Sequence, residues 1–473
     1  MTAEDLAYLP AARAAALIRA KQLSPVELVR VYLDRIAALD GDLGAYITVC
    51  GDAALAAARH AEHAIASGAA VGPLHGVPVA VKDQFHTRGV LTTAGSKVLA
   101  DFVPDEDATV IARLHGAGAI LLGKLNLSEF ALGGTIRHPY GQPRNPWARD
   151  REPGGSSSGS GIAAAAGLCS AALGEDTGGS IRGPAAYCGV VGLRPTWGRV
   201  SRAGCVAVSW SMDAAGPLTR TVEDSALLLG AIAGRDRRDP LTSRRPVPDY
   251  RQALAAGARG LTIGVIGELT DGADTDPEVR HAVTEAAAVL AREGADVRPV
   301  SLPLLPRAGA VFMALADSDG AGIHHRWLRE RPGDYDAATR RRLLAASLIP
   351  AALHQAAQRA RALIRQEIAS ALERFDALLS PAQPTPAPLI AAGGAPVTSG
   401  EEASRRFFTR RSYSTPASLA GLPAISVPCG WSAGGLPIGL QLIGRPFDEA
   451  TVLRLGHAYE EAAGWTGRRP DLD

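Results

Sequence analysis

Apolar and polar residues recur along the chain with two periods, one typical of helices and one of strands. Ser24, Pro25 and Glu27 mark a helix start, because they supply a capping side chain, a fixed φ angle and a first-turn carboxylate. Helices are predicted at 3–19, 24–39, 52–66, 107–115, 221–234 and 277–292, with a mainly helical stretch at 307–375. Strands are predicted at 46–49, 77–81, 119–122, 261–267, 295–300, 424–427 and 438–443, with a Pro/Ala/Gly-rich loop at 381–396.

The order of these elements predicts the fold class. Helices alternate with strands, and tight hairpin signals are few. Such alternation is typical of an α/β protein whose sheet lies between layers of helices. We therefore predict a mixed, largely parallel sheet covered by helices.

Two Gly-Gly-Ser turns interrupt the pattern, at 154–156 and 178–180. Between them, residues 162–173 are small and apolar, which predicts a buried helix followed by a strand. Composition alone would favour a flexible linker. Linkers, however, do not alternate with buried apolar segments. Glycine leaves backbone N–H groups open to a ligand, and a serine on a sharp turn can act as a nucleophile.

Composition sets the broad class. The 473 residues suffice for a large core, and 47% hydrophobic with 21% charged residues is ordinary for a soluble globular protein. Lys and Arg number 49 and Asp and Glu 48, a net charge of +1. Because neither sign dominates, we expect no nucleic-acid partner and no membrane partner.

The five cysteines are scattered and contain no C-x-x-C pair, which argues against disulfides or zinc and favours a reducing cytoplasm. The N-terminus has no basic region before an apolar stretch, so we expect no signal peptide. The sequence contains no run of about 18 strongly apolar residues, so we expect no membrane-spanning helix.

Several ordered motifs together resemble the amidase signature hydrolases. They are L-H-G-V-P-V-A-V-K-D (74–83), N-P-W (145–147), P-G-G-S-S-S-G-S (153–160), G-E-D-T-G-G-S-I-R-G-P-A-A (174–186), G-P-L-T-R-T-V-E-D (216–224) and A-G-L-P-A-I-S-V-P (420–428). The resemblance is weakest between about 235 and 399. It implies one amidase signature domain over 1–473, with a catalytic core at about 60–235 and 415–463 and a variable helical region at about 305–413.

The resemblance also implies a catalytic triad without metal or cofactor. Ser180 would be the nucleophile, Ser156 the proton shuttle on a cis peptide after Gly155, and Lys82 the base. The two serines are 24 positions apart, as in the family. Lysine is a base only when neutral, and burial lowers its pKa towards the working range. The backbone N–H groups that would stabilise the oxyanion are those of Thr177, Gly178, Gly179 and Ser180.

One position departs from the family pattern. Ser158 stands where the family usually has glycine, which would be costly if the turn needed a positive φ there. We expect Ser157 to support the turn by hydrogen bonding. Asp176 and Arg182 are interpreted as a partly buried structural pair, with substrate contact by Arg182 as the less favoured alternative.

Other chemistries are less well supported. Ser157 lies in a formal G-x-S-x-G, but no buried strand precedes it, which disfavours a Ser-His-Asp hydrolase. Gly118–Lys124 resembles a phosphate loop without its Ser or Thr. His138, His324 and His325 are expected at the surface or lining the pocket, because no metal-binding motif accompanies them.

The sequence favours an amidase that acts on linear amides, namely an amidohydrolase of small or aryl/acyl amides, with carbamates or esters as further substrates. The expected partner is a small-molecule amide, and a homodimer is left open. The alternative is the A subunit of a glutamine-dependent tRNA amidotransferase. In the latter an aspartate helps to hold the glutamine amino group, whereas this chain has Arg411, which would repel an ammonium. A catalytically inactive binding protein is disfavoured because all three triad positions are occupied.

The substrate pocket is expected to be apolar. By resemblance, Phe130, Ala131, Leu132 and Gly133 would line its acyl side. Residues from 307–350 and 399–413 would close the leaving-group side.

Overall fold

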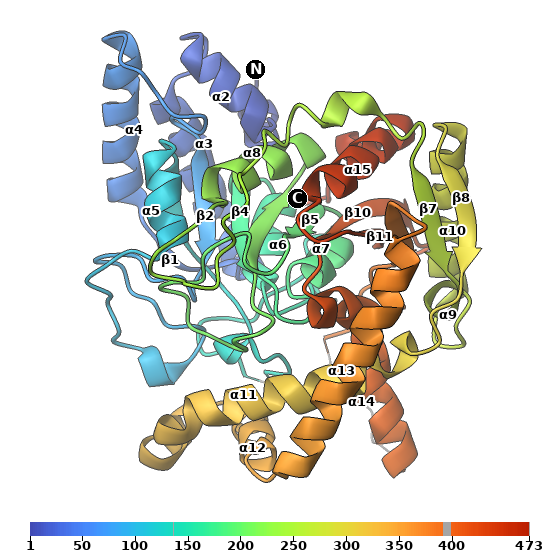
Figure 1. Cartoon of the computed structure of the whole chain (residues 1–473). Helices are drawn as coiled ribbons and strands as arrows, with labels where there is room; N and C mark the ends of the chain where they lie inside the picture. The colour runs from blue at the N-terminus through green and yellow to red at the C-terminus, as the bar shows by residue number, and fades with distance from the viewer. Residues whose placement is uncertain (136, 391–398, 473) are drawn as a thin grey trace.

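The computed structural model describes residues 1–135, 137–390 and 399–472. Its strands form one sheet of eleven, in the order β1-β3-β2-β4-β6-β5-β10-β11-β9-β7-β8 (Figure 1). The strands are β1 (Tyr46–Val49), β2 (Pro78–Lys82), β3 (Ile120–Leu125), β4 (Ala171–Glu175), β5 (Val191–Arg194), β6 (Ala215–Thr219), β7 (Thr262–Ile266), β8 (Asp296–Val300), β9 (Ala377–Pro381), β10 (Ala424–Trp431) and β11 (Pro437–Gly444).

The sheet is mixed, as predicted, but the expectation that it is largely parallel is wrong. Among the described strands, β2 pairs in parallel with β3 and β4, and β7 with β8 and β9. The other six pairings are antiparallel. The alternation of helix and strand favoured helical crossovers between parallel strands. The prediction missed strands β5 and β6, and it missed the short turn at 432–436 that makes β10 and β11 antiparallel neighbours.

Helices cover both faces of the sheet (Figure 1). On β2, Val79 and Val81 belong to a core shared with α5, α8, α10 and α15, whereas Ala80 belongs to a core shared with α1–α4 and α6. The helices are α1 (Ala3–Ala7), α2 (Ala11–Arg19), α3 (Pro25–Leu43), α4 (Gly51–Ala66), α5 (Thr109–Gly116), α6 (Ser158–Ala165), α7 (Arg182–Cys188), α8 (Val222–Ile232), α9 (Gly267–Thr270), α10 (Pro277–Arg292), α11 (Ala308–Glu330), α12 (Ala337–Ala346), α13 (Ala351–Leu372), α14 (Gly400–Ala420) and α15 (Glu449–Ala463).

Capping and proline explain two helix boundaries. Ser24 accepts hydrogen bonds from the N–H groups of Val26 and Glu27, so α3 starts where the sequence predicts. The predicted helix 3–19 is divided in two, because Pro10 has no N–H to continue α1 and instead precedes α2.

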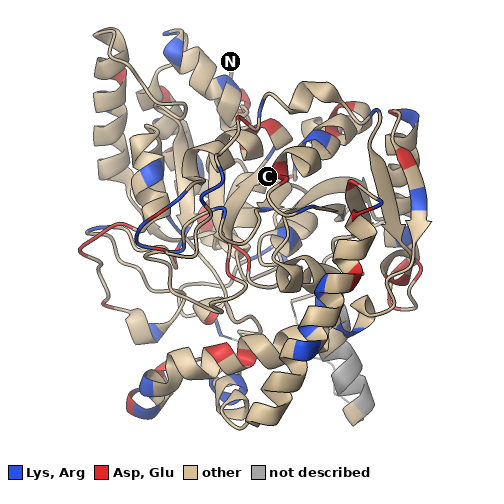
Figure 2. Ribbon diagram, in the orientation of Figure 1, with Lys and Arg blue, Asp and Glu red and all other residues tan. Residues whose placement is uncertain are grey.

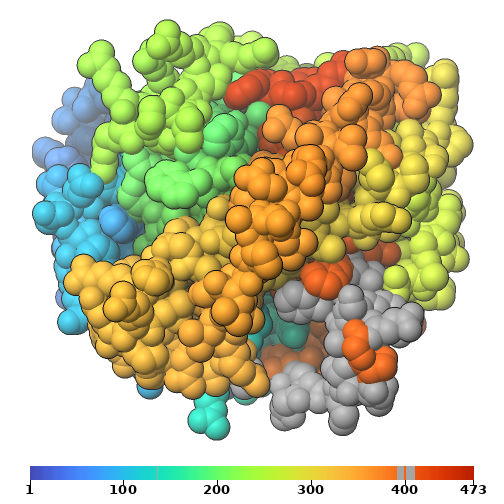
Figure 3. All heavy atoms as spheres, turned by 60° about the horizontal axis from the view of Figure 1, so that its bottom comes forward, coloured from blue at the N-terminus to red at the C-terminus, as the bar shows by residue number. Residues whose placement is uncertain are grey.

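Three helices lie across one end of the sheet. Figure 3 shows this face, with α11, α12 and α13 crossing it and a recess beside them. α11 and α13 share an apolar core with α14 and with Leu378 of β9, whereas Leu343 of α12 belongs to a separate core with Phe130 and Leu132. Residues of α11 and α12 line the same cavity as the loop that follows β4, where the candidate chemistry lies.

Two predicted segments lie partly outside the described residues. These are the loop 381–396 and the segment 399–413, of which most side chains are not described. In the described part of the chain, no helix is long and apolar enough to cross a membrane.

Candidate active site

Lys82 ends β2 and is completely buried. Its Nζ donates hydrogen bonds to Ser156 Oγ at 2.8 Å, to the Glu175 carbonyl at 3.2 Å and to Glu175 Oε2 at 3.3 Å. Burial lowers the pKa of Lys82, although the Glu175 carboxylate partly offsets this effect. The lysine is therefore positioned to exchange a proton with Ser156.

Ser156 lies in a tight turn that its neighbours hold in place. The Gly155–Ser156 peptide is cis, as the resemblance implied. The Ser156 carbonyl accepts the N–H of Ser128, and the Ser157 N–H bonds to the Ser180 carbonyl. Ser157 Oγ donates to the Glu175 carbonyl at 3.1 Å, so Ser157 supports the turn as expected.

The substitution at Ser158 does not disturb the turn, because Ser158 starts α6 and has no positive φ. Gly159, the next residue, is the position that requires glycine. A Cβ there would lie 2.2 Å from the Ala45 carbonyl oxygen and 2.5 Å from the Asn126 nitrogen.

Ser180 lies in the loop between β4 and α7 and is partly exposed to the same cavity as Ser156. Of the four N–H groups proposed for the oxyanion, that of Gly179 already donates to Asp176 Oδ1 at 2.8 Å. Within the described ranges, the N–H groups of Thr177, Gly178 and Ser180 have no acceptor. The candidate donors are therefore these three, and Gly179 is removed from the set.

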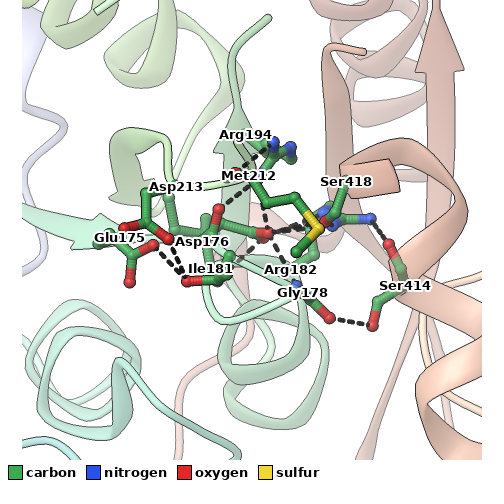
Figure 4. Close-up of polar contacts among 12 residues, drawn as sticks. Glu175, Asp176, Gly178, Ile181, Arg182, Arg194, Met212, Asp213, Ser414 and Ser418 are labelled. Atoms are coloured by element: carbon green, nitrogen blue, oxygen red, sulfur yellow. Dashed lines mark hydrogen bonds and ion pairs between the residues drawn. The ribbon is translucent and has the colours of Figure 1, made fainter. Parts of the chain in front are cut away.

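The loop is anchored by a buried charged cluster (Figure 4). Arg182 and Arg194 each lie 3.1 Å from Asp176 Oδ1, and all three side chains are inaccessible. Burial alone would raise the pKa of Asp176, but the two guanidinium groups outweigh it and hold that pKa below its usual range. Arg182 also donates to Ser414, Ser418 and Gln441, so it is structural and does not face the cavity.

Sequence reasoning missed both acidic groups near the lysine, Glu175 and Asp213. Thr177 Oγ1 lies 2.8 Å from Glu175 Oε1 and also 2.8 Å from Asp213 Oδ1. Burial first, and the Glu175 charge second, raise the pKa of Asp213 to about 8. The available signal concerned Glu175 only, which with Thr177 flanks Asp176 just before the second glycine turn.

A cavity of about 660 Å³ opens onto Ser156 and Ser180. Its wall includes Ala131, Leu132 and Gly133, which were predicted, but it is less apolar than expected. The polar side chains that line it include those of Thr135, His138, Gln142, Glu152, Arg342, Gln383 and Arg411.

Phe130 does not line the cavity, which corrects the prediction for that residue. Its ring packs behind the wall, with its centroid 4.3 Å from His324 and 5.6 Å from Trp327. Phe130 and Ala131 both have positive φ angles, 48° and 57°, and this turn directs the aromatic ring away from the cavity.

Two arginines place positive charge on the cavity wall. Arg342 pairs with Asp317 at 2.6 Å and donates to the Leu132 carbonyl. Arg411, from α14, is half-buried and lines the same space. Asp317 offsets the charge of Arg342, and Glu152 adds a carboxylate to the same wall, so the cavity carries charges of both signs.

The other candidate residues have structural positions. Lys124 of the phosphate-loop resemblance is buried in β3 and pairs with Asp83 at 2.9 Å. His324 is buried and bonds to the Tyr335 hydroxyl, and burial lowers its pKa to about 4. His138 lines the cavity, and burial lowers its pKa too.

The comparisons with known proteins agree on one family. A family model described as Amidase matches residues 27–453. A relative from Geobacter sp. (strain M21), named as the A subunit of glutamyl-tRNA(Gln) amidotransferase, is 42% identical over 96% of this chain and 97% of its own length.

Two solved structures have the same fold. One, described as a vestigial protein complex that reveals the origins of an s-triazine catabolic enzyme, is 35% identical with a TM-score of 0.89, covering 98% of this chain and 100% of its own. The other, a peptide amidase from Stenotrophomonas maltophilia, is 35% identical with a TM-score of 0.84, covering 98% of this chain and 99% of its own.

These relatives correct one expectation. The exclusion of nucleic acid rested on the balanced charge, and Figure 2 shows basic and acidic residues interspersed over the described ribbon. Yet several relatives at 42–43% identity over nearly the whole chain are named as part of an amidotransferase for glutamyl-tRNA(Gln). Net charge does not exclude nucleic acid here, because one chain can belong to a complex whose other parts bind the RNA.

Proposed function

The chain belongs to the amidase family, whose members act on carbon–nitrogen bonds. On this basis we propose that it cleaves a carboxylic amide through an acyl-enzyme on Ser180. The observation that carries the proposal is the 2.8 Å hydrogen bond between buried Lys82 and Ser156, at a cavity that Ser180 also lines. A hydroxyl is too weak an acid to attack an amide unless its proton is removed during the attack.

In the proposed reaction the proton moves through the two serines. Neutral Lys82 takes the Ser156 proton while Ser156 takes the Ser180 proton, and Ser180 Oγ bonds to the amide carbon. The oxyanion is held by N–H groups of Thr177, Gly178 and Ser180. The proton then returns through Ser156 to the leaving nitrogen, the C–N bond breaks, and water hydrolyses the acyl-enzyme by the same route.

Two candidates differ in the acyl group. The relatives' names favour glutamine, used within a tRNA amidotransferase to which this chain would contribute the glutamine-cleaving part. They support this alternative more directly than a small or aryl amide. That function would bring a tRNA and further protein chains as partners.

Arg411 favours the second candidate, a stand-alone amidase for amides that carry a carboxylate but no ammonium. Asp317 offsets the charge of Arg342, but Arg411 also lines the cavity, and a cation beside the substrate repels the α-ammonium of glutamine. Glutaramate, which is glutamine without its amino group, would avoid this repulsion.

Ammonia release by the purified chain from glutamine and glutaramate tests both candidates. We expect release from glutaramate to exceed release from glutamine, and no release by Ser180→Ala. A preference for glutamine, or activity only after the other amidotransferase chains are added, would assign the chain to the first candidate. Undiminished release by Ser180→Ala would refute the mechanism itself.

A further inference from the structure

Glu175, which contacts Lys82 at 3.3 Å, lies beside Asp213 (Figure 4). Both side chains are almost completely buried, and both approach the hydroxyl of Thr177 at 2.8 Å. A hydroxyl has one proton and can donate it to one carboxyl oxygen only. The other 2.8 Å contact is favourable only when that carboxyl is protonated and donates to Thr177 Oγ1.

The hydrogen bonds around Asp213 allow it to carry this proton. Its Oδ2 accepts the N–H groups of Val208 at 2.9 Å and Ser209 at 3.0 Å. The Ser209 N–H also lies 2.9 Å from Oδ1, and it can bond to Oδ2 alone when Oδ1 is protonated. Burial and the neighbouring Glu175 charge raise the pKa of Asp213 to about 8, which agrees with a proton held at neutral pH.

When Lys82 is neutral, as the proposed function requires, charge balance is met with one proton on the pair. Asp176 carries one negative charge between the two positive charges of Arg182 and Arg194. With one proton, Glu175 and Asp213 together carry one negative charge, so these five groups are neutral overall. Lys82 can then lose its proton without leaving an unbalanced charge in the buried site.

We propose that Glu175 and Asp213 share one proton across the Thr177 hydroxyl and thereby set the charge of Lys82. Glu175 contacts the lysine directly at 3.3 Å, and Asp213 acts on it through Thr177 and Glu175. Both are positioning residues, and the proposal rests on the proposed function, in which Lys82 is the base.

Other titratable groups face this cluster. The Cys205 thiol interacts with Lys82, Glu175 and Asp213, and burial raises its own pKa well above the ordinary value, so it stays neutral. Asp176 also acts on Lys82, and Arg194 interacts with Glu175. Asp176 and Arg194 form their own ion pair, so their charges, and the effect of those charges on the cluster, stay the same across neutral pH.

Asp213→Asn tests the shared proton without removing the hydrogen bonds. The asparagine oxygen can accept the Val208 and Ser209 N–H groups, and its NH₂ can donate to Thr177 as a protonated carboxyl would. We expect kcat/KM near pH 7 to stay within roughly tenfold of the wild type, against the roughly 10²–10⁴-fold that loss of a proton-transfer group costs. A loss as large as that of Asp213→Ala would mean that the negative charge of Asp213 is required, and would overturn the proposal.

Infrared difference spectra of wild type and Asp213→Asn give a readout that does not depend on activity. The wild type should show the carbonyl band of a buried protonated carboxyl at pH 7, and this band should fade as pH rises past about 8. An unchanged spectrum would show that no proton is shared. This measurement separates the two hypotheses, because the band can be present even when Lys82→Ala retains activity and the proposed function fails.

Glu175→Gln tests the effect on the lysine. Removal of the adjacent carboxylate should lower the Lys82 pKa, so the pH at which kcat/KM rises should fall by at least about one unit. A lower kcat with an unmoved pH profile would indicate a merely structural role for Glu175 and would contradict the proposal.

Discussion

At the scale of single residues, the account depends on a buried lysine that is neutral when it works. Desolvation lowers the pKa of Lys82, whereas Glu175 acts against that shift. Activity should therefore rise with pH through a pKa below the ordinary lysine value, because only the deprotonated amine can accept the Ser156 proton.

We predict that Ser180→Ala abolishes turnover and that Lys82→Ala reduces kcat by a factor on the order of 10⁴. Both residues act in the same proton-transfer sequence, so the double variant should lose little more than either single variant. Steady-state rates test this, with thermal unfolding as the check that both variants remain folded. Near-normal turnover by folded Lys82→Ala would contradict the mechanism.

Arg411 should control the choice between glutamine and glutaramate. Arg411→Asp replaces a cation with an anion on the cavity wall, which attracts the glutamine ammonium. We expect the ratio of kcat/KM for glutamine to that for glutaramate to increase by roughly tenfold or more, corresponding to about 1.4 kcal/mol. Arg411→Gln should give an intermediate ratio. An unchanged ratio in both variants would show that Arg411 does not sense the substrate's amino group.

At the scale of elements, close packing of α6 positions the first glycine turn. Gly159→Ala would place a Cβ 2.2 Å from the Ala45 carbonyl oxygen, and such overpacking typically costs about 1–3 kcal/mol of unfolding free energy. Gly116→Ala is the matched control, because Gly116 is also helical and a Cβ there meets nothing within 4 Å. Denaturant unfolding tests the pair, and equal stabilities would refute the packing argument.

The sequence predicted elements with strong local signals and missed features that depend on long-range packing. The helix at 277–292 was predicted with its observed bounds, because Asp276 and Pro277 mark its start. Lys82, Ser156 and Ser180 were identified by resemblance; the two serines line one cavity, and Lys82 is buried behind Ser156, to which it donates a hydrogen bond. Asp213 was not identified, because it lies 36 positions from Thr177 and no local motif links the two. Phe130 was misplaced because its direction depends on an unusual φ angle.

At the scale of the whole molecule, Arg182 joins the loop that carries Ser180 to distant parts of the chain. It binds Asp176 beside that loop, Ser414 and Ser418 on α14, and Gln441 on β11. The loop geometry therefore depends on the docking of the C-terminal segments.

Arg182→Met should destabilise the fold by about 3–5 kcal/mol, because it removes one partner from a buried ion pair. The effect should diminish at low pH. The folded-state pKa of Asp176 is depressed, so its contribution is present above the unfolded-state pKa and is lost as pH falls through the folded-state value. Arg326→Met, which breaks the exposed pair with Glu330, should change stability little. Equal effects of the two substitutions in denaturant unfolding would contradict this account.

The most direct test of the central claim is to locate the acyl group during turnover. The purified enzyme would be quenched with acid while it hydrolyses glutaramate, or glutamine if that is the better substrate, and its peptides analysed by mass spectrometry. The account predicts an acyl adduct on Ser180 in the wild type and none in Ser180→Ala. An adduct on another residue, or continued ammonia release by Ser180→Ala, would contradict it.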